Sequence, residues 1–470
     1  MVMTTGGSIA TVAGARQKLA LGWLWLAVYS LVSAGLMAVL LALSRTPLIE
    51  DLLENPALFK VALVVHVDLS AVIWFFACAG ALWSVLAPGA RGRADHAAFA
   101  LMAIGTLMIT AAPFVGAVRP LMNNYVPVLR HPWFFIGLVA ATAGVALQAS
   151  RYLRASRNGR AADDRVTAVL HPALELAAGV FLVAIYCVLV SLAVMPDGVR
   201  GEAYYELLFW GGGHVLQFAY TLMLLGAWLA LAIAAGARPA LPERTLRAAM
   251  LLVVVPLAVV PWLYAAPLDA PRHVRGFTEL MRWGGLACLP LGLMAVRAVW
   301  RAPAADTEGR RLRAAALCSI GLFAAGGLLG FLIRGSNTMV PAHYHGSVVA
   351  VTMALMGLVY YALPRLGRPI VLPRTALWQP YVYSIGQLMH VTGLAWCGGY
   401  GVQRKVAGAA QGLDGLGETA GMALMGLGGV VSVAGGMMFL LVALTALAGP
   451  LVMRASSRRR SDLQIAIPDP

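Results

Sequence analysis

Two histidines stand one residue apart in a stretch that otherwise has the composition of a membrane-spanning helix. Residues 341–349 read PAHYHGSVV, with His343 and His345 separated by a single tyrosine. Ionisable side chains inside a membrane are costly and usually mark a functional site. Neutral imidazole is a good ligand for iron and copper. The pair therefore points to metal or haem chemistry within the membrane.

The spacing of this pair limits how the two imidazoles can act. Successive residues of an α-helix are separated by about 100° around the axis, so positions 343 and 345 differ by about 200°. Rings on opposite faces do not easily chelate one metal, but each can bind a different haem. In this arrangement His66 and His345 form a bis-histidine, low-spin site, and His343 holds a second iron from one side only.

The remaining histidines divide into two groups. The chain has nine, and five are predicted to lie within about 5–15 Å of the outer membrane surface at 1.5 Å per residue: His66, His214, His343, His345 and His390. The others are expected at interfaces, His171 near a helix end and the rest as solvated or interfacial side chains in or beside loops: His96, His131 and His273. Five intramembrane imidazoles at one depth indicate a shared site.

Composition identifies the elements that must position these side chains. The 470 residues are 60% hydrophobic and 12% charged, with mean hydropathy +0.79, and soluble domains carry roughly twice that charge fraction. Apolar runs of about 20 residues can cross a bilayer, and twelve are predicted: 21–43, 59–87, 97–117, 133–150, 169–194, 206–236, 246–266, 279–299, 313–333, 341–364, 375–400 and 420–453. We therefore expect an all-α polytopic membrane protein, a bundle of twelve transmembrane helices.

The distribution of charge gives the predicted topology. The net charge is +15, and arginines gather in alternate connections, such as residues 151–165 and 301–313. By the positive-inside rule both termini are cytoplasmic, with an N-terminal segment 1–20, a membrane domain 21–453 and a tail 454–470 that is expected to be disordered. This explanation of the positive charge leaves no argument for nucleic-acid binding. Five scattered cysteines without a CxxC pair indicate neither a disulfide framework nor a zinc site.

Four stretches together resemble subunit I, the catalytic subunit of haem-copper oxidases and nitric oxide reductases. NTMVPAHYHGSVVAVTMALMGLVYYALPRLG (337–367) looks like the tenth helix of that family, which supplies both haem ligands. VVHVDLSAVIWFF (64–76) is similar to the second helix, which gives the other low-spin ligand. ELLFWGGGHVLQFAY (206–220) resembles the sixth helix, whose histidine binds copper, and QLMHVTGLAWCGGYGVQRK (387–405) resembles the end of the eleventh.

The resemblance implies a cytochrome c oxidase subunit I type of bundle in a bacterial-type inner membrane. It implies two haems, expected to be haem b, bound by His66, His345 and His343. His343 and His214 are the catalytic candidates, with His214 also a candidate ligand of a non-haem metal. His390 is expected beside a cofactor, and Arg404 and Lys405 against haem propionates. The substrate would be O2 or NO. The electron donor would be an external cytochrome c or a copper-containing subunit, because the chain has no CxxCH motif.

The chain departs from the family pattern around the expected copper site. Two adjacent histidines should lie near VVPWLYAAP (259–267), where the sequence has Trp262, Leu263 and Tyr264 instead. The position four residues after His214, a tyrosine in many oxidases, is Phe218. Glu279 is either a structural residue near the membrane surface or an analogue of the glutamate beside the metal of nitric oxide reductases. Whether copper or another non-haem metal binds stays open.

Three functions are compatible with these features. The first is a respiratory oxidoreductase subunit that reduces O2 or NO at a high-spin haem. The second is a non-catalytic dihaem protein, an electron conduit or gas sensor, which the missing histidine pair favours. The third is a transporter with repeated halves. It is the weakest, because the glycine-rich interruptions GGGH (211–214) and CGGYG (397–401) coincide with the histidine layer and do not form matched halves.

Overall fold

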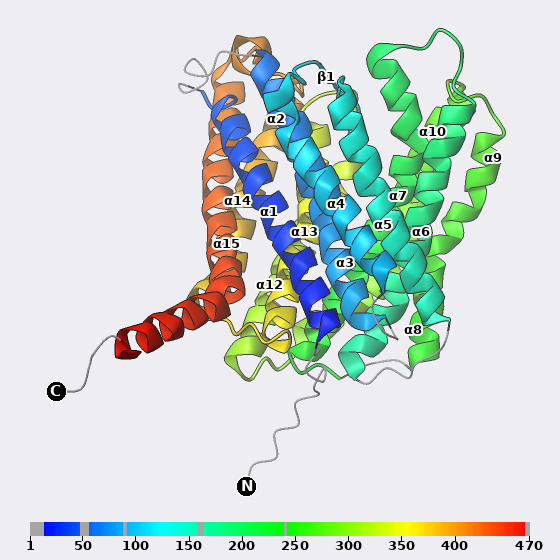
Figure 1. Cartoon of the computed structure of the whole chain (residues 1–470). Helices are drawn as coiled ribbons and strands as arrows, with labels where there is room; N and C mark the ends of the chain where they lie inside the picture. Colours follow the sequence, from blue (N-terminus) through cyan, green and yellow to red (C-terminus); the bar gives the residue numbers. More distant parts are fainter. Residues whose placement is uncertain (1–13, 48–55, 88–91, 158–163, 239–241, 466–470) are drawn as a thin grey trace.

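The computed structural model describes residues 14–47, 56–87, 92–157, 164–238 and 242–465, which form an almost entirely helical bundle (Figure 1). Within these residues, eleven helical segments are long and apolar enough to cross a membrane. The eleventh predicted span, α14 (Pro373–Gly399), has 27 residues and enough length for a crossing. It is not one of the eleven because it carries polar residues such as Gln379 and Gln387, which lower its hydropathy.

Nine of the predicted spans contain one long helix. These helices are α1 (Ala15–Leu43), α4 (Arg93–Ala111), α5 (Pro132–Ser156), α6 (Arg165–Ala193), α7 (Gly201–Ala234), α12 (Thr307–Phe331), α13 (Met339–Arg365), α14 and α15 (Leu416–Ile465). The second span is α2 (Pro56–Val67) and α3 (Trp74–Leu86), joined by a π-helical turn at Asp68–Ile73. Asp68 is buried at the start of this turn.

The seventh and eighth spans are broken inside their apolar runs. The seventh consists of α8 (Glu243–Val254), a 3₁₀ turn (Val255–Val259) and α9 (Val260–Tyr264). The eighth consists of α10 (Pro271–Glu279), two irregular turns over residues 280–288 and α11 (Leu289–Arg301). Pro256, Pro261 and Pro290 lie at these breaks, and proline removes a helical donor and clashes with the preceding turn. These two spans form the side of the bundle labelled α8, α9 and α10 (Figure 1).

Two helices lie at the centre of the bundle. The apolar stretches of α7 and α13 are the most deeply buried of all the spans, as expected for helices that are apolar on every face. Packing is strongest between consecutive spans: α4 with α5, α6 with α7, α12 with α13, and α14 with α15. The sites of interest therefore lie where α7 and α13 meet their neighbours.

A short hairpin covers one end of the bundle. β1 (Pro120–Leu121) and β2 (Val128–Leu129) pair in antiparallel fashion, with Pro120 opposite Leu129. The turn between them is held by Asn123, whose side-chain oxygen accepts hydrogen bonds from the backbone N–H groups of Tyr125 and Val126. This end is opposite the one where α1 begins (Figure 1).

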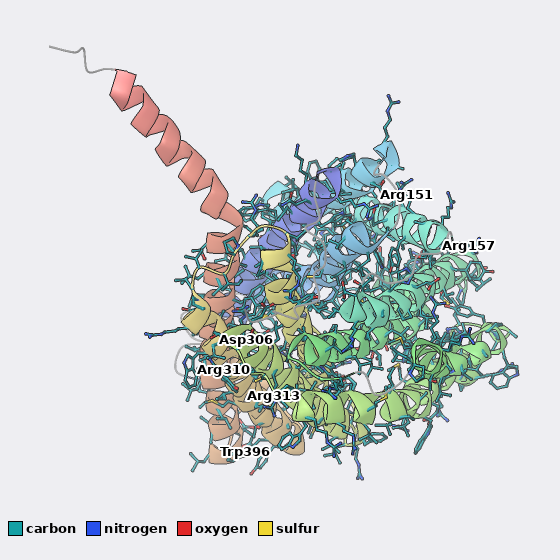
Figure 2. The ribbon with its side chains drawn as sticks, turned by 90° about the horizontal axis from the view of Figure 1, so that it is seen from below. Arg151, Arg157, Asp306, Arg310, Arg313 and Trp396 are labelled. Carbon is teal, nitrogen blue, oxygen red and sulfur yellow. The ribbon has the colours of Figure 1, made fainter. Side chains whose placement is uncertain are left out.

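The arginine-rich connections lie together at the other end of the bundle. Figure 2 views that end and labels Arg151 on the last turns of α5, Arg157 at its C-terminal end, and Arg310 and Arg313 at the start of α12. Asp306 begins α12, where its Oδ1 accepts a hydrogen bond from the backbone N–H of Gly309 at 2.6 Å. The alternation of arginine read from the sequence thus corresponds to two structurally distinct ends.

The expectation of a disordered tail after residue 453 is wrong for most of its length. α15 continues as one helix to Ile465 and extends away from the bundle (Figure 1). Residues 466–470 of the predicted tail and residues 1–13 of the predicted N-terminal segment lie outside the described residues. The predicted end of the last membrane run is therefore not the end of a helix.

Candidate functional site

His343 and His345 leave α13 toward different neighbours, as their spacing predicted. The Nδ1 atom of His343 is hydrogen-bonded to the carbonyl oxygen of Gly326 on α12, at 2.7 Å. Gly330, one turn further along α12, lies so close that a Cβ there would be 2.8 Å from His343 Nδ1. His345 instead meets His390 on α14, with ring centroids 4.7 Å apart. One helix therefore separates two imidazole environments.

Three histidines from three helices gather on the His345 side. His66 on α2 and His390 on α14 both lie within electrostatic range of the His345 ring. His66 Nδ1 is hydrogen-bonded to the Ala34 carbonyl oxygen at 2.9 Å, and His390 Nδ1 to that of Met425 at 3.0 Å. The helices α1, α2, α13, α14 and α15 therefore enclose this cluster.

A common hydrogen-bonding pattern orients most of these rings. The Nδ1 atoms of four histidines bond to backbone carbonyl oxygens: His66, His214, His343 and His390. An Nδ1–H donated to a carbonyl fixes the tautomer and leaves Nε2 as the atom with a free lone pair, the arrangement usual for metal-ligating histidines. These bonds thus prepare Nε2 of each ring as a ligand.

The His345 cluster offers the ligand type of a haem site. His66, His345 and His390 come from three different helices, and each is partly buried. In addition, His345 Nδ1 and the Gln387 side-chain oxygen are both buried, and the two side chains are close enough to interact. Imidazoles brought together from several helices fit the ligands of a haem.

Arg45, just beyond the end of α1, is a functional candidate that the sequence analysis missed. The side chain is 9% exposed, and its charge lies within range of His345, His390 and Tyr344. No ion pair with a carboxylate of the described residues balances it. Its Nε donates to the Gln411 side-chain oxygen at 3.2 Å and Nη2 to the Gln403 carbonyl at 3.4 Å. Burial lowers the pKa of Arg45 to about 10, so it remains a cation at neutral pH.

A buried cation without an anionic partner is costly. Among the described residues Arg45 has no such partner, and an acidic group of a bound cofactor would offset this cost. The signal that could have found Arg45 lies in the sequence. It follows the first apolar run, in a connection on the arginine-poor side of the predicted topology.

His214 lies apart from this cluster, in an aromatic environment on α7. Its ring centroid is 4.7 Å from that of Trp210, 4.9 Å from Tyr125 and 5.6 Å from Phe277. The glycine run before it makes room for these neighbours. A Cβ on Gly213 would lie 2.1 Å from the Tyr125 ring, and one on Gly211 would lie 2.3 Å from the Tyr264 hydroxyl. The GGGH motif thus allows aromatic side chains to pack on both sides of His214.

The expectation that His273 is a solvated or interfacial loop residue is wrong. The side chain is fully buried near the start of α10. Its Nδ1 is hydrogen-bonded to the Leu263 carbonyl oxygen at 3.3 Å, and its Nε2 has no partner. The ring packs against Tyr264 and Phe277, with centroids 4.9 and 5.0 Å away. Pro271 starts a helix here, and a helix carries position 273 inward together with position 277, one turn later.

Arg404 and Lys405 lie at the hairpin end, in a polar cavity of about 370 Å³ that Glu202 and Glu206 also line. Arg404 Nη1 donates to the Asn124 side-chain oxygen at 2.8 Å. Lys405 Nζ donates to the Asn123 carbonyl at 3.1 Å. The two basic residues therefore fasten the loop after α14 to the hairpin, and it is Arg45 whose charge reaches the His345 cluster.

Opposite charges meet around this cavity. The two glutamates at the start of α7 hold the other side of the hairpin: Glu202 accepts from Met122 N at 3.1 Å and Glu206 from Asn124 N at 3.0 Å. Burial lowers the pKa of Lys405 to about 8, with neighbouring Arg404 adding to the effect. Burial, and secondarily Glu206, raises the pKa of the Tyr125 hydroxyl well above its usual range.

Glu279 makes its side-chain contacts with the next turn of its own span. The carboxylate accepts hydrogen bonds from Arg282 at 2.9 Å and from the Trp283 ring nitrogen at 2.7 Å. The side chain is 48% exposed. These contacts are typical of an acid near the membrane surface.

Comparison with known proteins identifies the family. The family model for the cytochrome c and quinol oxidase polypeptide I matches residues 18–438. An uncharacterized protein of Rickettsia prowazekii (strain Madrid E) is 27% identical over 91% of this chain and 95% of its own length. An uncharacterized protein of Aquifex aeolicus (strain VF5) is 30% identical over 73% of this chain and 84% of its own length.

The fold agrees with this match. A haem-copper terminal oxidase solved as a dimer by cryo-electron microscopy superposes with a TM-score of 0.71, covering 93% of this chain and 84% of that one at 17% identity. At this identity the likeness concerns the fold, which is that of a haem-copper oxidase subunit I. The length of the family match, together with the order of the histidine-bearing helices, leads to one conclusion: the chain belongs to the cytochrome c and quinol oxidase polypeptide I family of membrane oxidoreductases.

Proposed function

We propose that the protein is the haem-binding subunit of a respiratory oxidoreductase and reduces a small gas, O2 or NO, at a haem held by His343. The observation that carries this proposal is the separation of His343 and His345 onto opposite faces of α13. His345 faces His390 and lies near His66, whereas His343 faces α12. One helix can therefore serve two haems with different coordination.

The residues on each side support different roles. His66 and His345 would hold a low-spin haem, with His390 beside them. His343 would be the single protein ligand of a high-spin haem at which the gas would bind. When bound, haem iron supplies one-electron transfer and an open coordination position. The protein orients each imidazole through its Nδ1 bond and keeps the rings inside an enclosed bundle.

The surroundings support the remaining parts of the proposal. Both termini are proposed to be cytoplasmic, in a bacterial-type inner membrane, because the arginine-rich connections lie at the end where α1 begins. The histidines then lie toward the outer side, where an external cytochrome c or a copper-containing subunit could deliver electrons. Both haems are proposed to be haem b.

A second candidate function is a dihaem electron conduit or gas sensor without catalysis. The specific observation in its favour is the lack of histidine in α9, where Tyr264 turns its hydroxyl toward α6 and donates to the Cys187 carbonyl at 2.9 Å. This candidate would bind the same two haems as the first and differs only in that it does not reduce a gas.

Spectroscopy and gas consumption test the proposal. The protein, purified from membranes in detergent, is expected to contain two haems per chain in a pyridine haemochrome assay, with one low-spin signal. Membranes containing the protein should consume O2 or NO with a reduced donor, and the His343→Ala variant should lose this activity while retaining the low-spin signal. Absence of haem would overturn both candidates. Two haems without gas consumption would favour the conduit or sensor.

A further inference from the structure

The place where the family holds its second metal is filled by aromatic side chains in this chain. A copper site needs about three or four nitrogen, oxygen or sulfur ligands, and His214 would be one of them. The next two would come from α9. That helix contributes Trp262, which is 58% exposed, Leu263, which has an apolar side chain, and Tyr264. None of the three carries an imidazole.

The Tyr264 hydroxyl already has hydrogen-bonding partners on α6. Its hydroxyl donates to the Cys187 carbonyl of α6 and lies 3.0 Å from the Ser191 hydroxyl. It also presses against the backbone of Gly211. The phenol therefore anchors α9 to α6 and α7, and its oxygen already has two hydrogen-bonding neighbours.

Phe277 packs against both imidazoles of this region. Its ring centroid is 5.6 Å from that of His214 and 5.0 Å from that of His273. Tyr125 and Trp210 cover two further sides of His214. His214 and His273 both pack against the Phe277 ring, and two imidazoles without a third metal-binding side chain make a poor chelating site. Within the described residues no group of three or more histidine, cysteine, aspartate and glutamate side chains is arranged to hold a metal ion.

The surrounding glycines show that this packing is built into the sequence. Gly211 makes room for Tyr264 and Phe277, and Gly213 for Tyr125. A side chain at either position would collide with an aromatic ring. The sequence thus provides the space that the aromatic residues need, and His214 is enclosed by them. The residues present do not fit a family-type copper centre.

We infer that the gas-binding centre of this protein is mononuclear: a single high-spin haem iron, with an aromatic cluster of Tyr125, Trp210, Tyr264 and Phe277 in place of a second metal. The inference rests on the proposed function, since it presupposes the haem on His343. It goes beyond that function by defining the centre that a substrate meets. Any reduction here draws its electrons through the haems alone.

Metal analysis of the purified holoprotein tests this inference. Elemental analysis by mass spectrometry should find about two iron atoms per chain and less than about 0.1 copper or zinc atom per chain. The result should be the same before and after the protein is incubated with copper and desalted. The His214→Gln variant should give the same metal content. A stoichiometric copper or zinc that is lost in His214→Gln would overturn the inference.

Electron paramagnetic resonance provides a second readout that does not depend on activity. An isolated ferric high-spin haem should give its axial signal at full spin count, because no neighbouring paramagnetic metal is present to couple to it. A strongly diminished signal that returns in His214→Gln would contradict a mononuclear centre. A protein without haem would instead refute the proposed function, so the two failures are distinguishable.

Discussion

The imidazole rings of His345 on α13 and His390 on α14 lie with their centroids 4.7 Å apart and their planes inclined by 53°. This contact joins two helices on the side of α13 that faces away from Gly326, the partner of His343. His66 is close enough to affect the same ring electrostatically. The His345 cluster thus has three imidazoles where a bis-histidine haem needs two, and mutagenesis can separate their roles.

The first prediction concerns these three histidines. His66→Ala and His345→Ala should each remove the low-spin haem, lowering the haem content from about two to about one per chain, because an axial ligand is lost. His390→Ala should keep both haems and alter the low-spin absorption band, because this ring contacts the cofactor without ligating iron. If His390→Ala loses the low-spin haem and His66→Ala retains it, the second ligand of that haem is His390 and not His66.

The second prediction concerns the buried charge of Arg45. Arg45→Gln should lower the midpoint potential of the low-spin haem, since a cation near the cofactor favours the reduced state. An effect of about tenfold in the redox equilibrium corresponds to about 59 mV for one electron. Because the pKa of Arg45 is about 10, the difference from wild type should be the same in mildly acidic and neutral buffers.

Gln411→Ala is the matched control for Arg45. It removes the acceptor that Arg45 Nε uses and retains the charge, so the potential should stay near that of wild type. Equal potentials in Arg45→Gln and wild type by redox titration would refute the electrostatic role. Equal shifts in both variants would point to the loop contact instead of the charge.

The third prediction concerns the glycine beneath the hairpin. Gly213→Ala should destabilise the protein by about 1–3 kcal/mol, because the new Cβ would overlap the Tyr125 ring and overpacking has this cost. Gly179→Ala on α6 is the control: a Cβ there meets nothing within 4 Å, and alanine is the better helix former. Thermal unfolding in detergent gives the comparison. The double variant Gly213→Ala with Tyr125→Ala should recover part of the loss, and no recovery would mean that the overlap is not the cause.

The fourth prediction concerns Lys405 and pH. The pKa of Lys405 falls to about 8 in the folded protein from an ordinary value of 10.5. Between these two values the unfolded chain binds more protons than the folded one, so this residue makes the protein more stable as pH rises. Relative to Lys405→Met, wild type should therefore gain thermal stability between about pH 8 and pH 10.5. A constant difference across that range would contradict the lowered pKa.

The membrane architecture and the histidine-bearing helices could be predicted from the sequence. Twelve apolar runs predict twelve spans, because a helix must be about 20 apolar residues long to cross a bilayer. Within the described residues, eleven helical segments are long and apolar enough to do so. Opposite directions for His343 and His345 follow from the helical repeat alone, and the structure confirms them through contacts with Gly326 and His390. Arginine alternation likewise anticipated two different ends of the bundle.

Contacts between distant segments required the tertiary structure. Arg45 and His345 are 300 positions apart, and no local pattern indicates that a loop arginine faces an imidazole on α13. His273 looked like a loop residue, but the short helix α10 carries it into the bundle. The glycines before His214 suggested an interruption of the helix, whereas they accommodate Tyr125 and Tyr264 from other segments. Helical periodicity fixes the direction of a side chain on its own helix, and packing between helices decides which side chain it meets.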